Sequence, residues 1–116
     1  MKKLALLLLC SLSLFAQKKN MLIPYEKGNG NQTATYAEVI EWFTQLDKQY
    51  ESVQMLEMGP TDGGQHLHIV IFNPDKVFDF DQIKKEKAVL LINNGIHPGE
   101  PDGIDATMML YRDLAM

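Results

Sequence analysis

The sequence predicts an α/β fold, the N-terminal part of a mixed sheet flanked by helices. Three observations predict it: a capped amphipathic helix after Thr35, two alternating runs on either side of a glycine-rich turn, and an apolar run over 88–92 that precedes a second helix. The chain of 116 residues has room for one small domain. We therefore treat everything after the N-terminal leader as one unit.

The first helix is marked by its start. Thr35 is followed three residues later by Glu38, the spacing of a capping box, in which each residue satisfies a free backbone N–H of the other. Apolar residues then recur every three or four positions, which gives the segment one apolar face. We predict a helix over about residues 36–50.

Two strands and a turn come next. Residues 53–58 and 66–71 alternate between apolar and polar side chains, and Gly59, Asp62 and Gly64 lie in the stretch between them. This pattern predicts an antiparallel hairpin, followed by a polar connection that runs to Lys87.

The next segment is apolar throughout. Ala88–Ile92 has no polar position, as is typical of a central strand covered on both faces. A helix is expected to begin near Pro101 or Asp102, because proline and acidic residues favour the first helical turn. Its nearly continuous apolar surface predicts that this helix is buried.

The N-terminus has the pattern of a secretory signal peptide over residues 1–16. Lys2 and Lys3 are followed by a short apolar run and by the small residue Ala16. We expect a protein that is exported, secreted or periplasmic, without stable membrane association after cleavage; an uncleaved anchor is the alternative. Residues 17–34, with no clear period, are interpreted as an irregular leader.

Composition excludes some functions and raises a question of size. The net charge of −4 argues against nucleic-acid partners, which need a basic surface. A strand covered on both faces and a buried helix need more neighbours than three strands and two helices supply. Residues 35–116 are therefore expected to form an incomplete domain.

One motif points to chemistry. His97-Pro98-Gly99-Glu100 follows the apolar run, and ligands of α/β sheets gather at the carboxyl ends of strands. An imidazole and a carboxylate three residues apart can aim at one zinc ion if the turn between them is tight. Two ordinary roles stay open at this point: Glu100 could favour the helix N-terminus electrostatically, and His97 could be a loop histidine.

The stretch Asn93–Pro101 resembles the first zinc-binding segment of the M14 family of zinc metallocarboxypeptidases. The turn Gly59–Gly64 is similar to the family's Gly-x-Ser-x-x-Gly turn, and the order of elements agrees over residues 35–116. The resemblance implies a carboxypeptidase-like domain, a zinc cofactor and hydrolysis of peptide bonds. It assigns His97 and Glu100 as metal ligands and places every catalytic residue outside this chain, so the chain alone is expected to be an inactive N-terminal fragment.

The sequence departs from the family at three places. Thr61 replaces the usual serine, and Gln65 stands where a basic residue is usual. Pro98-Gly99 differs from the digestive members, so the chain is not assigned to that branch. Two alternatives accompany the peptidase hypothesis: a zinc amidohydrolase or deacylase acting on acylated amino acids, and a non-catalytic remnant.

Other polar and sulfur-containing residues have simpler interpretations. His66 and His68 share one strand face and could form a metal pair, but a half-exposed strand face is the favoured interpretation. Asp62 and Asp105 are expected to be turn and helix residues. Core or interface packing is expected for Trp42, Met108 and Met109.

Overall fold

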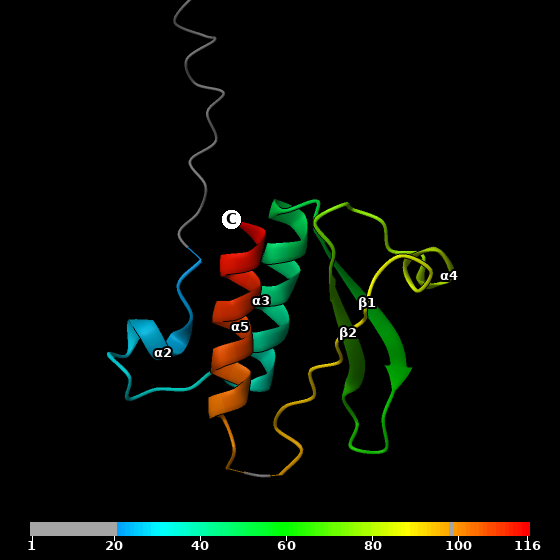
Figure 1. The fold of residues 1–116 in the computed structure, drawn as a ribbon. Helices are drawn as coiled ribbons and strands as arrows, with labels where there is room; N and C mark the ends of the chain where they lie inside the picture. Colours follow the sequence, from blue (N-terminus) through cyan, green and yellow to red (C-terminus); the bar gives the residue numbers. More distant parts are fainter. Residues whose placement is uncertain (1–20, 98) are drawn as a thin grey trace, which may run out of the picture.

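The computed structural model describes residues 21–97 and 99–116. The elements follow in the order α2 (Pro24–Lys27), α3 (Tyr36–Gln49), β1 (Val53–Pro60), β2 (His66–Phe72), α4 (Phe80–Ile83) and α5 (Asp102–Ala115). Helices α3 and α5 lie side by side, with α3 against β1 and α5 against β2 (Figure 1). The fold is therefore α/β, with a layer of two helices on a two-stranded antiparallel sheet.

Helix α3 begins as the sequence predicts. The Glu38 N–H donates to Thr35 Oγ1 over 3.4 Å, and the Thr35 N–H donates to Glu38 Oε2 over 2.8 Å. The backbone bond to Thr35 lowers the pKa of Glu38, because it favours the ionised carboxylate. The capping box and the helix are confirmed, and the helix ends at Gln49, one residue before the predicted boundary.

Strands β1 and β2 form the predicted antiparallel hairpin. Val53 pairs with Phe72, and the ladder continues to Pro60 opposite His66. The register shifts between Glu57 and Gly59, which leaves Met58 as the extra residue of a β-bulge. Strand β1 runs two residues beyond the predicted end at Met58.

The core lies between the helix pair and the hairpin. Phe43 stands at its centre, with Trp42 at a ring-centroid distance of 5.0 Å and Tyr111 at 5.5 Å, both edge to face. Tyr111 also donates its hydroxyl to the Val70 carbonyl over 2.8 Å, and burial raises the pKa of this phenol. The buried apolar residues are Met21, Ile23, Trp42, Phe43, Leu46, Tyr50, Val53 and Met108.

The segment expected to be an irregular leader contributes to this core from Met21 onwards. Ile23 is completely buried and Met21 nearly so, and residues 24–27 form the short helix α2. The Trp42 indole N–H donates to the Met21 carbonyl over 3.1 Å. The predicted signal peptide over residues 1–16 lies outside the described part of the chain.

The prediction of a buried central strand over Ala88–Ile92 is wrong. The segment is not a strand, and Leu90 and Leu91 are 84% and 85% exposed. A strand buried on both faces needs a partner on each edge, and in the described residues β1 and β2 pair only with one another. The segment Ala88–Ile92 is therefore apolar enough to be buried, but no element among the described residues covers it.

Helix α5 is amphipathic rather than buried all round, so that expectation is also wrong. Met108 is fully buried against the core, whereas Leu110 and Leu114 are exposed. The predicted start at Pro101 or Asp102 is confirmed. The connection before Lys87 contains α4, which Asp79 caps by accepting from the Asp81 N–H. Among the described residues, no helix has the length and apolar character to cross a membrane.

Candidate metal site

The loop before α5 rests closely on the helix. A side chain at Gly103 would place its Cβ only 2.6 Å from Asn94 Oδ1, and one at Gly95 would come within 2.7 Å of Ile104 Cδ1. Gly95 also has a φ of +66°, which disfavours any residue with a Cβ. Asn94 donates from Nδ2 to Thr107 Oγ1. These contacts fix the loop just before the candidate ligands.

His97 and Glu100 face one another across this loop. Nδ1 of His97 lies 3.2 Å from Oε1 and 3.3 Å from Oε2 of Glu100. Gly99, with a φ of +84°, provides the tight turn expected between them. Pro101 then starts the helix, since its carbonyl accepts from the Ile104 and Asp105 N–H groups. The two side chains are 69% and 58% exposed, so the pair is open to solvent.

The separation of these atoms is suited to a shared metal ion. Zinc bonds of the usual length in tetrahedral geometry place a nitrogen and an oxygen ligand about 3.4 Å apart. The observed 3.2 and 3.3 Å approach that value. They also lie within the range of an N–H···O hydrogen bond, so the two side chains form a hydrogen-bonded pair in this structure. His97 and Glu100 could therefore hold zinc, His97 through Nδ1 and Glu100 through one or both oxygens.

The described residues supply no further ligand to this pair. Among residues 21–97 and 99–116, no group of three or more His, Cys, Asp or Glu side chains is placed to hold a metal. A hydrolytic zinc site needs three protein ligands and an open position for water. The pair would supply two of the three protein ligands that such a site needs.

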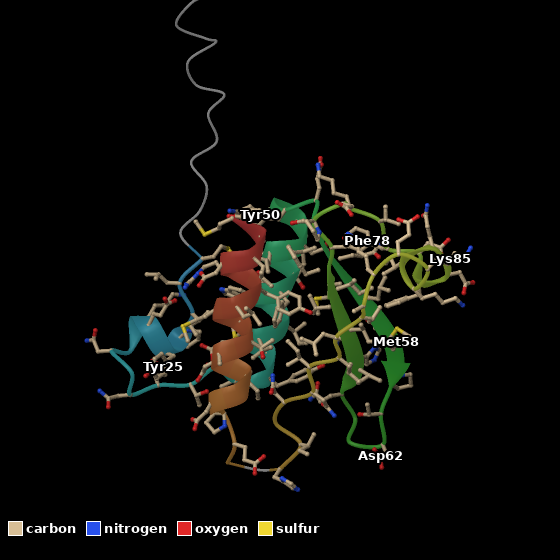
Figure 2. The ribbon with its side chains drawn as sticks, in the orientation of Figure 1. Tyr25, Tyr50, Met58, Asp62, Phe78 and Lys85 are labelled. Carbon is tan, nitrogen blue, oxygen red and sulfur yellow. The ribbon has the colours of Figure 1, made fainter. Side chains whose placement is uncertain are left out.

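The turn that resembles the family's Gly-x-Ser-x-x-Gly sequence is built as its glycines suggest. Gly59 and Gly64 have φ values of +108° and +77°. Thr61 closes the turn twice, because its N–H and its hydroxyl both donate to the Gln65 carbonyl. Asp62 lies at the tip of this turn (Figure 2). Asp62 is thus a turn residue, and Thr61 closes the turn.

His66 and His68 lie away from the His97 loop in sequence, on β2. His66 Nδ1 is 2.5 Å from Glu57 Oε1, and His68 Nδ1 is 3.0 Å from the His66 carbonyl. Tyr36 of α3 donates its hydroxyl to that same carbonyl over 2.7 Å. The favoured interpretation, a half-exposed strand face, agrees with the exposure of this part of β2.

Sequence reasoning did not find two part-buried polar contacts of α5. Arg112 is only 14% exposed and reaches Glu26 Oε2 over 2.6 Å, so it joins α5 to the N-terminal segment. The bond from Arg112 lowers the pKa of Glu26, and the same bond raises the pKa of Arg112. This pair carries no local signal in the sequence, because its two partners are 86 residues apart.

Asp105 is the second of these contacts. Its Oδ2 accepts from the Thr33 hydroxyl over 2.7 Å, and its Oδ1 is buried without a hydrogen-bond partner in the described part of the chain. The expectation that Asp105 is a helix residue is confirmed, but its burial was not anticipated. The one signal in the sequence for this burial is the position of Asp105, an acidic residue on the otherwise apolar side of α5.

Comparison with protein-family models, with curated proteins and with solved structures found no match to this chain.

Proposed function

We propose that the full-length protein is a zinc-dependent hydrolase of the carboxypeptidase type, to which this chain contributes His97 and Glu100 as two metal ligands. The observation that carries the proposal is the approach of His97 Nδ1 to both Glu100 oxygens at 3.2 and 3.3 Å, near the spacing of two zinc ligands. The resemblance of Asn93–Pro101 to a zinc-binding segment supports it.

The residues around the pair have positioning roles in this proposal. Gly95 and Gly103 allow the loop to lie on α5, so the ligands are held relative to a rigid helix. Zinc, when bound, would polarise the scissile carbonyl and activate water. His97 and Glu100 would orient it, and the proposal places the third ligand and the general base outside the described residues.

Peptides are the proposed substrates, and acylated amino acids are the alternative. Both reactions break an amide bond by the same zinc chemistry, so His97 and Glu100 would have the same role in either reaction. Parallel assays on peptides and on N-acyl amino acids with the full-length protein distinguish them. A remnant without activity would hydrolyse neither and would bind zinc poorly or not at all.

Alanine substitution tests the ligand assignment in the full-length protein. We expect His97→Ala and Glu100→Ala each to lose most of the tightly bound zinc and of the hydrolytic activity, because each removes one of three protein ligands. Glu51→Ala is the matched control, since Glu51 is an exposed carboxylate paired with Lys76. Zinc content that stays at the parental value in both ligand variants would exclude the assignment.

The isolated residues 17–116 provide a separate test of completeness. Two ligands without a general base should give weak zinc binding and no release of C-terminal amino acids from peptides. The measurement is a peptidase assay on this purified segment with added zinc. Chelator-sensitive turnover would show that the site is complete within these residues.

A further inference from the structure

A second set of imidazoles lies on the hairpin, on elements different from those of the His97 loop. His66 and His68 are two positions apart on β2, so their side chains leave the same face of the strand, with Cα atoms about 6.8 Å apart. Glu57 of β1 is directly opposite His68 in the ladder, and its carboxylate reaches His66. The three side chains therefore share one face of the sheet.

The proton on the His66 ring can be assigned from its neighbour. Nδ1 of His66 lies 2.5 Å from Glu57 Oε1, and an ionised carboxylate only accepts hydrogen bonds. The nitrogen in this contact must carry the hydrogen. The neutral ring is then protonated at Nδ1, and Nε2 carries the lone pair.

The same reasoning applies to His68. Its Nδ1 lies 3.0 Å from the His66 carbonyl oxygen, which is also an acceptor. The Tyr36 hydroxyl, 3.4 Å from this Nδ1, gives its own proton to the same carbonyl over the shorter distance of 2.7 Å. Neither the Tyr36 hydroxyl nor the His66 carbonyl donates a hydrogen to Nδ1 of His68. This Nδ1 therefore carries the hydrogen, and Nε2 carries the lone pair.

We propose that His66 and His68 form a two-imidazole binding site for a divalent transition-metal ion, with Zn²⁺ as the ion used to test it. Metal-binding histidines usually donate their other ring N–H to a carboxylate or a backbone carbonyl, and here Glu57 and the His66 carbonyl accept those two bonds. Imidazole nitrogen suits Zn²⁺, Ni²⁺ and Cu²⁺, whereas Mg²⁺ prefers oxygen ligands. Glu57 is a positioning residue in this site and not a ligand.

The site is independent of the proposed hydrolase function. It uses β1, β2 and the first turn of α3, and none of its residues belongs to the His97 loop. With two protein donors, the ion would keep water in its other positions, so binding is expected to be weaker than in a closed structural site. The surface position of His66 leaves room for that water.

Equilibrium dialysis against Zn²⁺ tests the proposal on the full chain carrying His97→Ala and Glu100→Ala, which removes the other candidate ligands. We expect one bound ion and no binding of Mg²⁺. His66→Ala or His68→Ala should weaken zinc binding at least about tenfold, and Glu57→Gln about tenfold. Glu51→Gln, which alters an exposed carboxylate paired with Lys76, should leave the affinity unchanged.

Zinc binding that is absent, or that survives both histidine substitutions, would overturn the proposal. A measurement on the unsubstituted side chains accompanies the variants. Nitrogen NMR of the two rings without metal should show the hydrogen on Nδ1 of both neutral imidazoles. Hydrogen on Nε2 of both rings would contradict the assignment that presents the lone pairs to an ion.

Discussion

Two regions of this chain, α3 and the segment Ala88–Ile92, both carry large apolar side chains but differ in their surroundings. Helix α3 places Trp42, Phe43 and Leu46 in a core closed by the hairpin and α5. The segment Ala88–Ile92 exposes most of Leu90 and Leu91. In α3 the apolar residues recur at helical spacing, so one face of the helix is buried and the other is exposed to solvent. An apolar pattern in the sequence thus indicates how much apolar surface a segment has. Whether that surface is buried depends on the elements that pack against it.

The strongest test of this difference replaces one leucine in each region by alanine. Leu46→Ala should reduce the free energy of unfolding by about 2–5 kcal/mol, because Leu46 is fully buried and its loss leaves a cavity. Leu90→Ala should change it by less than about 0.5 kcal/mol. Urea denaturation followed by circular dichroism measures both. An equal loss in the two variants would mean that Leu90 is buried in solution.

A smaller effect is expected at the ion pair that joins α5 to the N-terminal segment. Arg112→Met should cost about 1–3 kcal/mol of unfolding free energy, because the substitution leaves the poorly exposed Glu26 carboxylate without its charged partner. Lys76→Met, at the exposed pair with Glu51, should cost much less, because solvent screens this pair. Thermal or urea denaturation of both variants at neutral pH decides between them.

The same pair predicts a pH dependence of stability. The Arg112 hydrogen bond lowers the folded-state pKa of Glu26 below its ordinary value of 4.5. The stabilisation is therefore complete above that ordinary value and is lost as the pH falls through the folded-state pKa. Glu26→Gln should flatten this part of the acid profile. An unchanged acid profile in Glu26→Gln would show that other carboxylates control it.

An effect of similar size is expected at the loop that follows Ala88–Ile92 and rests on α5. Gly95→Ala should cost about 1–2 kcal/mol or more, because its φ is positive and its Cβ would approach Ile104 Cδ1 to 2.7 Å. Gly99→Ala has the same backbone penalty but no neighbour within 4 Å, so it should cost less. Denaturation of the two variants measures the difference, and equal values would remove the packing argument for Gly95.

The elements that the sequence predicts well are those with local signals. The Thr35–Glu38 capping box, the turn between Gly59 and Gly64 and the start of α5 near Pro101 all depend on residues within one turn of each other. The tight turn at Gly99 and the approach of His97 to Glu100 were predicted for the same reason. Each of these features is fixed by backbone geometry over a few residues.

Long-range contacts were beyond the sequence. Burial of Met21 and Ile23 depends on packing against later elements, and the Thr33–Asp105 bond joins positions 72 residues apart. The exposure of Ala88–Ile92 has the opposite origin, because a continuous apolar run contains no information about which strands are present beside it. The zinc hypothesis has the same limit, since two ligands from one loop do not identify the third.

The anchoring of Met21 has a consequence for proteolysis. Its carbonyl accepts from the Trp42 indole over 3.1 Å and from Arg112 over 3.4 Å, and its side chain is buried. An exopeptidase that shortens the chain from its N-terminus would have to break both bonds and expose part of the core to remove this residue. Removal of Met21, and of each residue after it, should therefore cost stability.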